Sequence, residues 1–245
     1  MAEPVALNQL AAELGLGAHE HIAIVGGGGK TTILHTLGQQ LTGTVVLTCT
    51  TKMGSSEHRG LPVVYEPTVD RVREAVAKGR GPVMVWKAID GPKAVGVRPE
   101  HCDAWFEVVD QIVIEADGSK QRPFKAPANY EPVVPSTTTV MVSVIGADAL
   151  GRVIADRCHR PLRVAALAGC HPFQRLSPAA AASVLLHERG ARKELPAGAR
   201  FCVVVTKIDP VSEPFVDQLV DELRDRDSSV PVVVVGSQGP GEGTR

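Results

Sequence analysis

Seven short runs of apolar, mostly β-branched residues recur along the chain, and helical patterns separate them. The runs cover 22–25, 45–48, 83–86, 112–115, 139–145, 201–206 and 232–235. Most of them lack a polar face, which is typical of parallel strands that helices cover on both sides. The helical patterns fall at 31–41, 69–78, 100–107, 178–188 and 213–224, with a further one at 7–14. This alternation predicts an α/β fold with a doubly wound, mostly parallel sheet.

Length and composition fit a single domain of this kind. With 245 residues, of which 44% are hydrophobic, the chain can bury one sizeable core. We expect that domain over 1–235 and a flexible, Gly-rich tail over 236–245. The net charge of −1 and the lack of basic runs with interleaved aromatics argue against nucleic acid as a partner. No apolar run reaches the ~20 residues that span a bilayer, so we expect no membrane association.

The cysteines and the first residues indicate a compartment. The five cysteines are scattered and form no CxxC pair, as is usual for reduced thiols. The first twenty residues carry acids and lack the basic and apolar regions of a signal peptide. We therefore expect a cytoplasmic protein.

A run of four glycines follows the first predicted strand, in 22-IAIVGGGGKTT-32. Glycines Gly26, Gly27, Gly28 and Gly29 would let a phosphate approach the backbone N–H groups at the start of the next helix. Lys30 would then add a positive charge for the β- and γ-phosphates, the hydroxyl of Thr31 would ligate Mg²⁺, and Thr32 would complete the loop. The pattern Gly26-x-x-Gly29-Lys30-Thr31 is two residues shorter than the usual phosphate-binding loop, a length found in some nucleotide-dependent ligases. An ordinary glycine-rich turn is the alternative.

Polar residues end three further predicted strands, where ligands bind in this kind of fold. After the second strand, 48-TCTTKM-53 offers Thr50 as a metal ligand and Lys52 as a phosphate contact, or merely a polar strand end. After the fourth, 112-IVIEADGSK-120 offers Glu115 and Asp117 for the magnesium shell and Lys120 for phosphate, or a turn at Asp117-Gly118.

The sixth strand ends in 203-VVVTKID-209, which resembles the element that reads guanine in nucleotide-binding proteins. Asp209 could accept hydrogen bonds from the base while the Lys207 stem packs on its ring. A plain strand end is the alternative. Two Cys-His pairs, Cys158-His159 and Cys170-His171, offer soft ligands for Zn²⁺ or Cu⁺, but their 11-residue gap fits no familiar pattern.

The segment 117–136 interrupts the alternation with four prolines and no clear period. So long a loop in a compact domain is usually functional or disordered. We expect a Pro-rich insertion that closes over the nucleotide or presents a partner substrate.

From about His21 to Asp209, the chain resembles the YqeC family, described as accessory proteins of selenium-dependent molybdenum hydroxylases. The resemblance rests on these stretches: 25-VGGGGKTT-32, 48-TCTTK-52, 115-EADGSK-120, 125-KAP-127, 131-EP-132 and 159-HRP-161. The chain departs from the family pattern at Gly27, Cys49 and Tyr130, where Ala, Thr and His are usual. The resemblance implies a cytoplasmic protein of P-loop NTPase type that works in molybdenum enzyme maturation.

Three functions remain open from the sequence. The first is a nucleoside triphosphatase or transferase that uses Mg²⁺ with ATP or GTP and serves a molybdenum hydroxylase or a cofactor client. In it Lys30, with Lys52 or Lys120, would meet the charge on the transferred phosphoryl group, and Asp117 or Glu115 would complete the magnesium shell. The second is a small-molecule kinase or ligase, and the third is a non-catalytic chaperone for the molybdenum cofactor. A homodimer is a further expectation.

Overall fold

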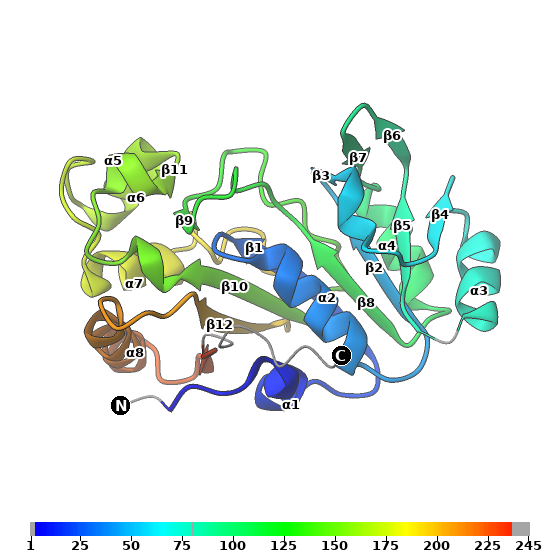
Figure 1. Ribbon diagram of the computed structural model, residues 1–245, viewed down its shortest axis with the longest axis horizontal. Helices are drawn as coiled ribbons and strands as arrows, with labels where there is room; N and C mark the ends of the chain where they lie inside the picture. Colours follow the sequence, from blue (N-terminus) through cyan, green and yellow to red (C-terminus); the bar gives the residue numbers. More distant parts are fainter. Residues whose placement is uncertain (1–2, 80, 237–245) are drawn as a thin grey trace, which may run out of the picture.

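Eight parallel strands form the central sheet of the protein, whose computed structural model describes residues 3–79 and 81–236 (Figure 1). In spatial order the strands are β13 (Val232–Val234), β12 (Arg200–Thr206), β10 (Val140–Gly146), β1 (Glu20–Gly26), β8 (Gln111–Glu115), β2 (Val45–Cys49), β5 (Val83–Trp86) and β4 (Val63–Tyr65). Every pairing in this sheet is parallel. The α/β fold with a mostly parallel sheet is therefore confirmed, and each of the seven predicted runs forms a strand.

Two hydrophobic cores lie on opposite faces of this sheet. Alternate residues of β1 enter different cores: Ile22 and Ile24 one of them, Ala23 and Val25 the other. The first core contains side chains of α1 (Leu10–Glu13) and α2 (Lys30–Gln40). The second contains those of the remaining helices: α3 (Val69–Lys78), α4 (Pro99–Phe106), α5 (Ile154–Arg157), α6 (Pro161–Ala168), α7 (Pro178–Leu186) and α8 (Glu213–Arg226). Burial on both faces explains why the strands carry no polar side.

Local signals account for where several helices begin. The side chain of Thr68 accepts from the N–H of Arg71 before α3, and Ser177 accepts from that of Ala180 before α7. Proline occupies the first turn of α4, α6, α7 and α8, where its missing N–H costs nothing. The four-residue α5, the eight-residue α6 and the edge strand β4 were not predicted.

Smaller elements surround the main sheet. Three 3₁₀ turns lie at Leu7–Gln9, Ser55–His58 and Ala147–Ala149. An antiparallel sheet of β3 (Lys52–Gly54), β7 (Lys93–Val95) and β6 (Ala88–Asp90) stands beside β5 at the upper right of Figure 1. A two-stranded pair joins β9 (Phe124–Lys125) to β11 (Cys158–His159), near α5 and α6.

The Pro-rich segment 117–136 is largely packed into the protein rather than free. Residues 123–128 are buried, and β9 lies within this stretch. The backbone N–H of Val133 also donates to the carbonyl of Ala116, at 3.0 Å. Residues 120–122 and 129–130 form its exposed turns, so only short pieces of the segment are placed to cover a ligand.

The topology gathers the predicted polar positions at one edge. Parallel strands end at the same edge of a sheet, and β8 lies next to β1 with Glu115 in register with Ile24. Of the predicted tail 236–245, all but Gly236 lies outside the described residues. Across the described part of the chain, no helix combines the length and the apolar character needed to cross a membrane.

Candidate functional site

The glycine run forms a tight loop between β1 and α2 that only glycine can build. Gly26, Gly28 and Gly29 have positive φ angles of 93°, 89° and 121°. A Cβ on Gly28 would lie 2.2 Å from the backbone nitrogen of Gly146, and a Cβ on Gly27 would lie 2.4 Å from the carbonyl oxygen of Arg122. Both contacts are with backbone, which cannot swing aside. The loop is therefore packed between the end of β10 and the Pro-rich segment: Gly27 and Gly28 are buried, and the N–H of Gly27 donates to the carbonyl of Val144 at 2.9 Å.

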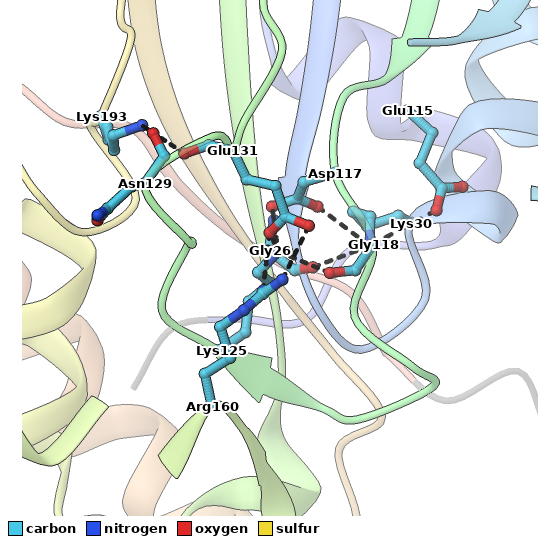
Figure 2. Close-up of polar contacts among 10 residues, drawn as sticks. All are labelled: Gly26, Lys30, Glu115, Asp117, Gly118, Lys125, Asn129, Glu131, Arg160 and Lys193. Atoms are coloured by element: carbon cyan, nitrogen blue, oxygen red, sulfur yellow. Dashed lines mark hydrogen bonds and ion pairs between the residues drawn. The ribbon is translucent and has the colours of Figure 1, made fainter. Parts of the chain in front are cut away.

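Lys30 is the first residue of α2, and its side chain folds back over the loop. Its ammonium lies 2.9 Å from the carbonyl oxygen of Gly26, 3.3 Å from Oδ1 of Asp117 and 3.6 Å from Oε1 of Glu115 (Figure 2). The residue is only 3% exposed. Burial by itself lowers the pKa of Lys30, but the two carboxylates outweigh it and raise that pKa above its ordinary value. Lys30 is therefore a fixed positive charge at the helix start.

The hydroxyl of Thr31 and the two carboxylates meet at the same place. Thr31 donates to Oε2 of Glu115 at 2.9 Å, and Oδ2 of Asp117 accepts from the N–H of Gly26 at 3.1 Å. Oδ1 of Asp117 is buried and makes no hydrogen bond, although it faces the ammonium of Lys30. A hydroxyl and two carboxylates are the hard oxygen donors that Mg²⁺ prefers, and a free buried carboxylate oxygen suits such an ion. The predicted group Lys30, Thr31, Glu115 and Asp117 thus lies together.

A cleft of about 410 Å³ opens over Lys30, Thr31 and Glu115, whereas Asp117 is buried and does not line it. The glycine loop and α2 line one side, the antiparallel sheet and its following turn line another, and the exposed turn of the Pro-rich segment completes it. Its basic residues are Lys30, Lys52, Arg59, Lys93, Lys120 and Lys207, and its acidic residues are Glu57 and Glu115. Six basic against two acidic side chains make the cleft suited to a polyanion.

The predicted lysines occupy different positions around the cleft. Lys52 pairs with Asp90 at 2.7 Å in an exposed ion pair. Lys120 and Lys207 both have positive φ angles, of 49° and 54°, which non-glycine residues seldom adopt. Such backbone conformations cluster at ligand sites. Lys207 also lines a second pocket.

That second pocket, of about 330 Å³, lies on the other side of the glycine loop. It shares Gly28, Gly29, Thr32 and Lys207 with the cleft. Its other walls are largely apolar and come from Leu7, Ile33, Thr206, Val235 and Gly236. The two hollows are thus joined at the loop, one charged and one apolar.

Two predicted site residues have other roles in the structure. The hydroxyl of Thr50 donates to the carbonyl of Val133 at 2.6 Å and so ties the Pro-rich segment to the end of β2. Asp209 accepts from the N–H groups of Ser212 at 2.7 Å and Val211 at 3.0 Å. The hydrogen bonds from Ser212 are the main cause of the lowered pKa of Asp209. Neither Thr50 nor Asp209 is among the described residues that line the two hollows.

The Cys-His pairs do not assemble into a metal centre. Cys158 is buried, and burial raises the pKa of its thiol to about 12, far from the thiolate that binds metal. Among the described residues, no group of three or more His, Cys, Asp or Glu is placed to hold an ion.

A chain of ion pairs, whose residues had no predicted role in the site, continues from Asp117 through Lys125 and Glu131 to Arg160. The ammonium of Lys125 lies 3.0 Å from Oδ2 of Asp117 and 2.7 Å from Oε2 of Glu131. Glu131 in turn accepts two hydrogen bonds from Arg160, at 2.7 Å and 3.0 Å (Figure 2). Lys193 donates to the backbone carbonyls of Asn129 and Glu131, at 2.8 Å and 2.6 Å. The sequence signal for Lys125, Glu131 and Arg160 was their place in the stretches that carry the family resemblance, 125-KAP-127, 131-EP-132 and 159-HRP-161.

The parallel sheet, with its glycine loop between β1 and α2, is consistent with a P-loop NTPase-like fold. Residues 22–162 match the model of the family described as YqeC protein. The chain is also 34% identical over 200 residues to "Uncharacterized protein YqeC" of Escherichia coli (strain K12), which covers 76% of each chain. No solved structure matches the chain. The chain belongs to the YqeC family.

Proposed function

We propose that the protein binds a nucleoside triphosphate together with Mg²⁺ in the cleft over the glycine loop, and hydrolyses it. The observation that carries the proposal is the convergence of Lys30, Thr31, Glu115 and Asp117 at the glycine loop, whose Gly28 and Gly29 line the cleft. The N–H groups of Gly26 and Gly27 already bind Asp117 and Val144, so the start of α2 would supply the N–H groups that attract phosphate oxygens. The surplus of basic side chains around the cleft attracts the same polyanion.

Magnesium has a defined part in this proposal. The triphosphate arrives beside two carboxylates, so without a metal ion its charge would be repelled by Glu115 and Asp117. Thr31, Glu115 and Asp117 would hold the ion and its water shell, and the ion would screen the carboxylates from the phosphates. Lys30 would then turn from its carboxylate partners to the phosphates. Lys52 and Lys120 are placed to meet charge that develops on the transferred phosphoryl group.

The nucleoside is proposed to occupy the apolar pocket beyond the loop. This pocket shares Gly28 and Gly29 with the phosphate cleft, and its apolar walls suit the flat face of a base. Lys207 lines both hollows, so its stem can pack on the base as expected. The carboxylate of Asp209 is held by its own turn, which favours ATP and GTP being bound alike.

The cellular role that we propose comes from the family resemblance. It is an accessory protein in the maturation of selenium-dependent molybdenum hydroxylases, where turnover drives delivery of a metal, cofactor or selenium group to a client enzyme.

Phosphate release tests the proposed hydrolysis. Purified wild-type protein with ATP or GTP should release phosphate only when Mg²⁺ is present. Thr31→Val keeps the side-chain shape but removes the proposed magnesium ligand, and should lower the rate about tenfold or more. Thr31→Ser keeps the hydroxyl and serves as the matched control. Equal rates in the two variants would refute the role of Thr31, and no release by the wild type with either nucleotide would refute hydrolysis.

A phosphoryl transferase is the second candidate, because one wall of the cleft offers more positive charge than the nucleotide site needs. Arg59 and Lys93 lie on that wall, on or near the antiparallel sheet, in addition to Lys52, which the nucleotide proposal already uses. They would suit a second anionic substrate beside the γ-phosphate. Product analysis separates the two functions: a transferase yields a phosphorylated acceptor, and a triphosphatase yields only free phosphate.

A further inference from the structure

The ion pairs from Glu115 to Arg160 alternate in sign through the interior. The sequence of charges is Glu115, Lys30, Asp117, Lys125, Glu131 and Arg160, each in contact with the next. The side chains of Lys125 and Asp117 are only 1% and 2% exposed. Buried ion pairs are seldom more stabilising than well-packed apolar side chains of the same volume. Stabilisation of the fold alone therefore does not explain why charged rather than apolar side chains occupy this part of the interior.

The geometry at Asp117 suggests what the chain does. One carboxylate oxygen, Oδ2, is held by the N–H of Gly26 and the ammonium of Lys125. The other oxygen, Oδ1, is thereby turned toward the ammonium of Lys30, which also contacts Glu115, and it has no hydrogen bond of its own. Lys125 thus fixes the orientation of the carboxylate without touching the ligand position.

Lys125 does not belong to Asp117 alone. Its ammonium is shared with Glu131, and Glu131 is shared with Arg160 through two hydrogen bonds. Arg160 is the outer end of the chain: its side chain is 19% exposed, and its guanidinium lies 6.0 Å from the ring centre of Tyr130. A change of charge at Glu131 or Arg160 must therefore alter the potential that Asp117 presents to a cation.

We propose that Lys125, Glu131 and Arg160 are positioning residues that set the magnesium affinity of Asp117 from outside the ligand site. This inference rests on the proposed nucleotide function. It assigns the buried half of the Pro-rich segment a task in the chemistry, where the sequence had suggested a lid.

The proposal predicts that charge removal at neighbouring residues of the chain changes the magnesium affinity in opposite directions. Glu131→Gln removes a negative charge, leaves Lys125 entirely to Asp117 and weakens magnesium binding. Arg160→Gln removes a positive charge, draws Lys125 toward Glu131 and strengthens magnesium binding. The carboxylates of Glu131 and Asp117 touch one ammonium and lie within about 6 Å of each other, so a change of threefold to tenfold in each direction is a reasonable order of magnitude.

The route through Glu131 adds a second requirement. If Arg160 acts on Asp117 by way of Glu131, then Arg160→Gln should change magnesium affinity much less in a protein that already carries Glu131→Gln. Two residues that affect the site independently would instead give additive changes.

The experiment titrates magnesium at a fixed concentration of a fluorescent ATP analogue, whose fluorescence reports binding. It compares the wild type, Glu131→Gln, Arg160→Gln, the double variant, and Arg163→Gln as matched control. Arg163 lies in the first turn of α6, which Arg160 directly precedes, but it donates to the side chain of Asn129 at 2.6 Å and lies outside the chain of ion pairs. Thermal unfolding of each variant separates loss of fold from loss of affinity.

We expect a higher magnesium midpoint for Glu131→Gln, a lower one for Arg160→Gln and no shift for Arg163→Gln. Both substitutions raising the midpoint would mean that the residues only support the fold, and would overturn the inference. Additive shifts in the double variant would overturn the route through Glu131. A wild type that binds no nucleotide at any magnesium concentration would overturn the proposed function, and this inference with it.

Discussion

Replacing Lys30 by Met tests the most unusual feature of the site, a buried lysine between two carboxylates. Met keeps the length of the side chain and removes the charge. Asp117 would keep Lys125 and the N–H of Gly26 as partners, and Glu115 would keep Thr31, but both would lose their shared cation. Removing one partner of a buried ion pair typically costs 3–5 kcal/mol. Because partners remain, we expect the low end, about 3 kcal/mol, or roughly 10 °C in Tm for a chain of this size.

Lys78→Met provides the matched control. Lys78 lies 3.6 Å from Glu74, the same separation as between Lys30 and Glu115, but its side chain is 78% exposed. Water screens that pair, so its loss should leave Tm unchanged within error. Thermal unfolding followed by circular dichroism, in buffer without metal ions, measures both variants against the wild type.

The pH dependence of the folding stability gives an independent test of the role of Lys30. Burial lowers the pKa of Lys30, but Asp117 and Glu115 outweigh it, so the folded pKa lies above the ordinary 10.5. A raised folded pKa means that the stabilisation is fully present below pH 10.5 and is lost as the pH rises through the folded value. The difference between wild type and Lys30→Met should therefore be constant at neutral pH and shrink in strong alkali. Equal Tm changes in the Lys30 and Lys78 variants at neutral pH would refute the reasoning.

Three further predictions concern single positions. Gly28→Ala should destabilise the protein by more than about 2 kcal/mol in urea unfolding and abolish nucleotide binding. The reason is that Gly28 has a positive φ angle and the added carbon would meet the backbone of Gly146. A stable variant that binds nucleotide would contradict this packing. Asp209→Ala should lower Tm, since it frees the N–H of Ser212, yet leave the ratio of ATP to GTP affinity unchanged; a changed ratio in competition binding would restore Asp209 as a base reader. Burial raises the pKa of Glu131, but Lys125 and Arg160 outweigh this effect and hold that pKa below its usual 4.5. The stability that the Glu131 carboxylate contributes is therefore present above pH 4.5 and is lost as the pH falls through the folded pKa. Acid titration should accordingly bring wild type and Glu131→Gln together, and a gap that persists at low pH would contradict this assignment.

The sequence predicts the central sheet well because its signal is local. Runs such as those of β1 and β10 are buried on both faces, so most of their positions are apolar and the run stands out. β4 was missed because it has three residues at the edge of the sheet, half-buried to exposed, with no such contrast. The four-residue helix α5 was missed because it has too few turns for a period to show. Length does not explain why α6 was missed, since α4 has the same eight residues and was predicted.

The site residues also differ in whether a local sequence signal predicts them. The glycine loop, Lys30 and Thr31 are contiguous, and Glu115 and Asp117 follow a strand whose end the parallel topology places beside them. The partners of Lys125 and Arg160 could not be predicted, because the pairs depend on how a prolyl segment without a period folds back into the core. Thr50 and Asp209 show the converse: a polar residue at a strand end can satisfy backbone groups instead of a ligand.

Calorimetric titration of the wild-type protein with ATP and with GTP, each in the presence and absence of Mg²⁺, tests the central claim most directly. Binding of one nucleotide per chain that requires Mg²⁺ is the expected result, because the carboxylates of Glu115 and Asp117 repel a bare triphosphate. Lack of binding by both nucleotides, or binding that Mg²⁺ weakens, would contradict the assignment of the glycine loop and its carboxylates as a magnesium–nucleotide site.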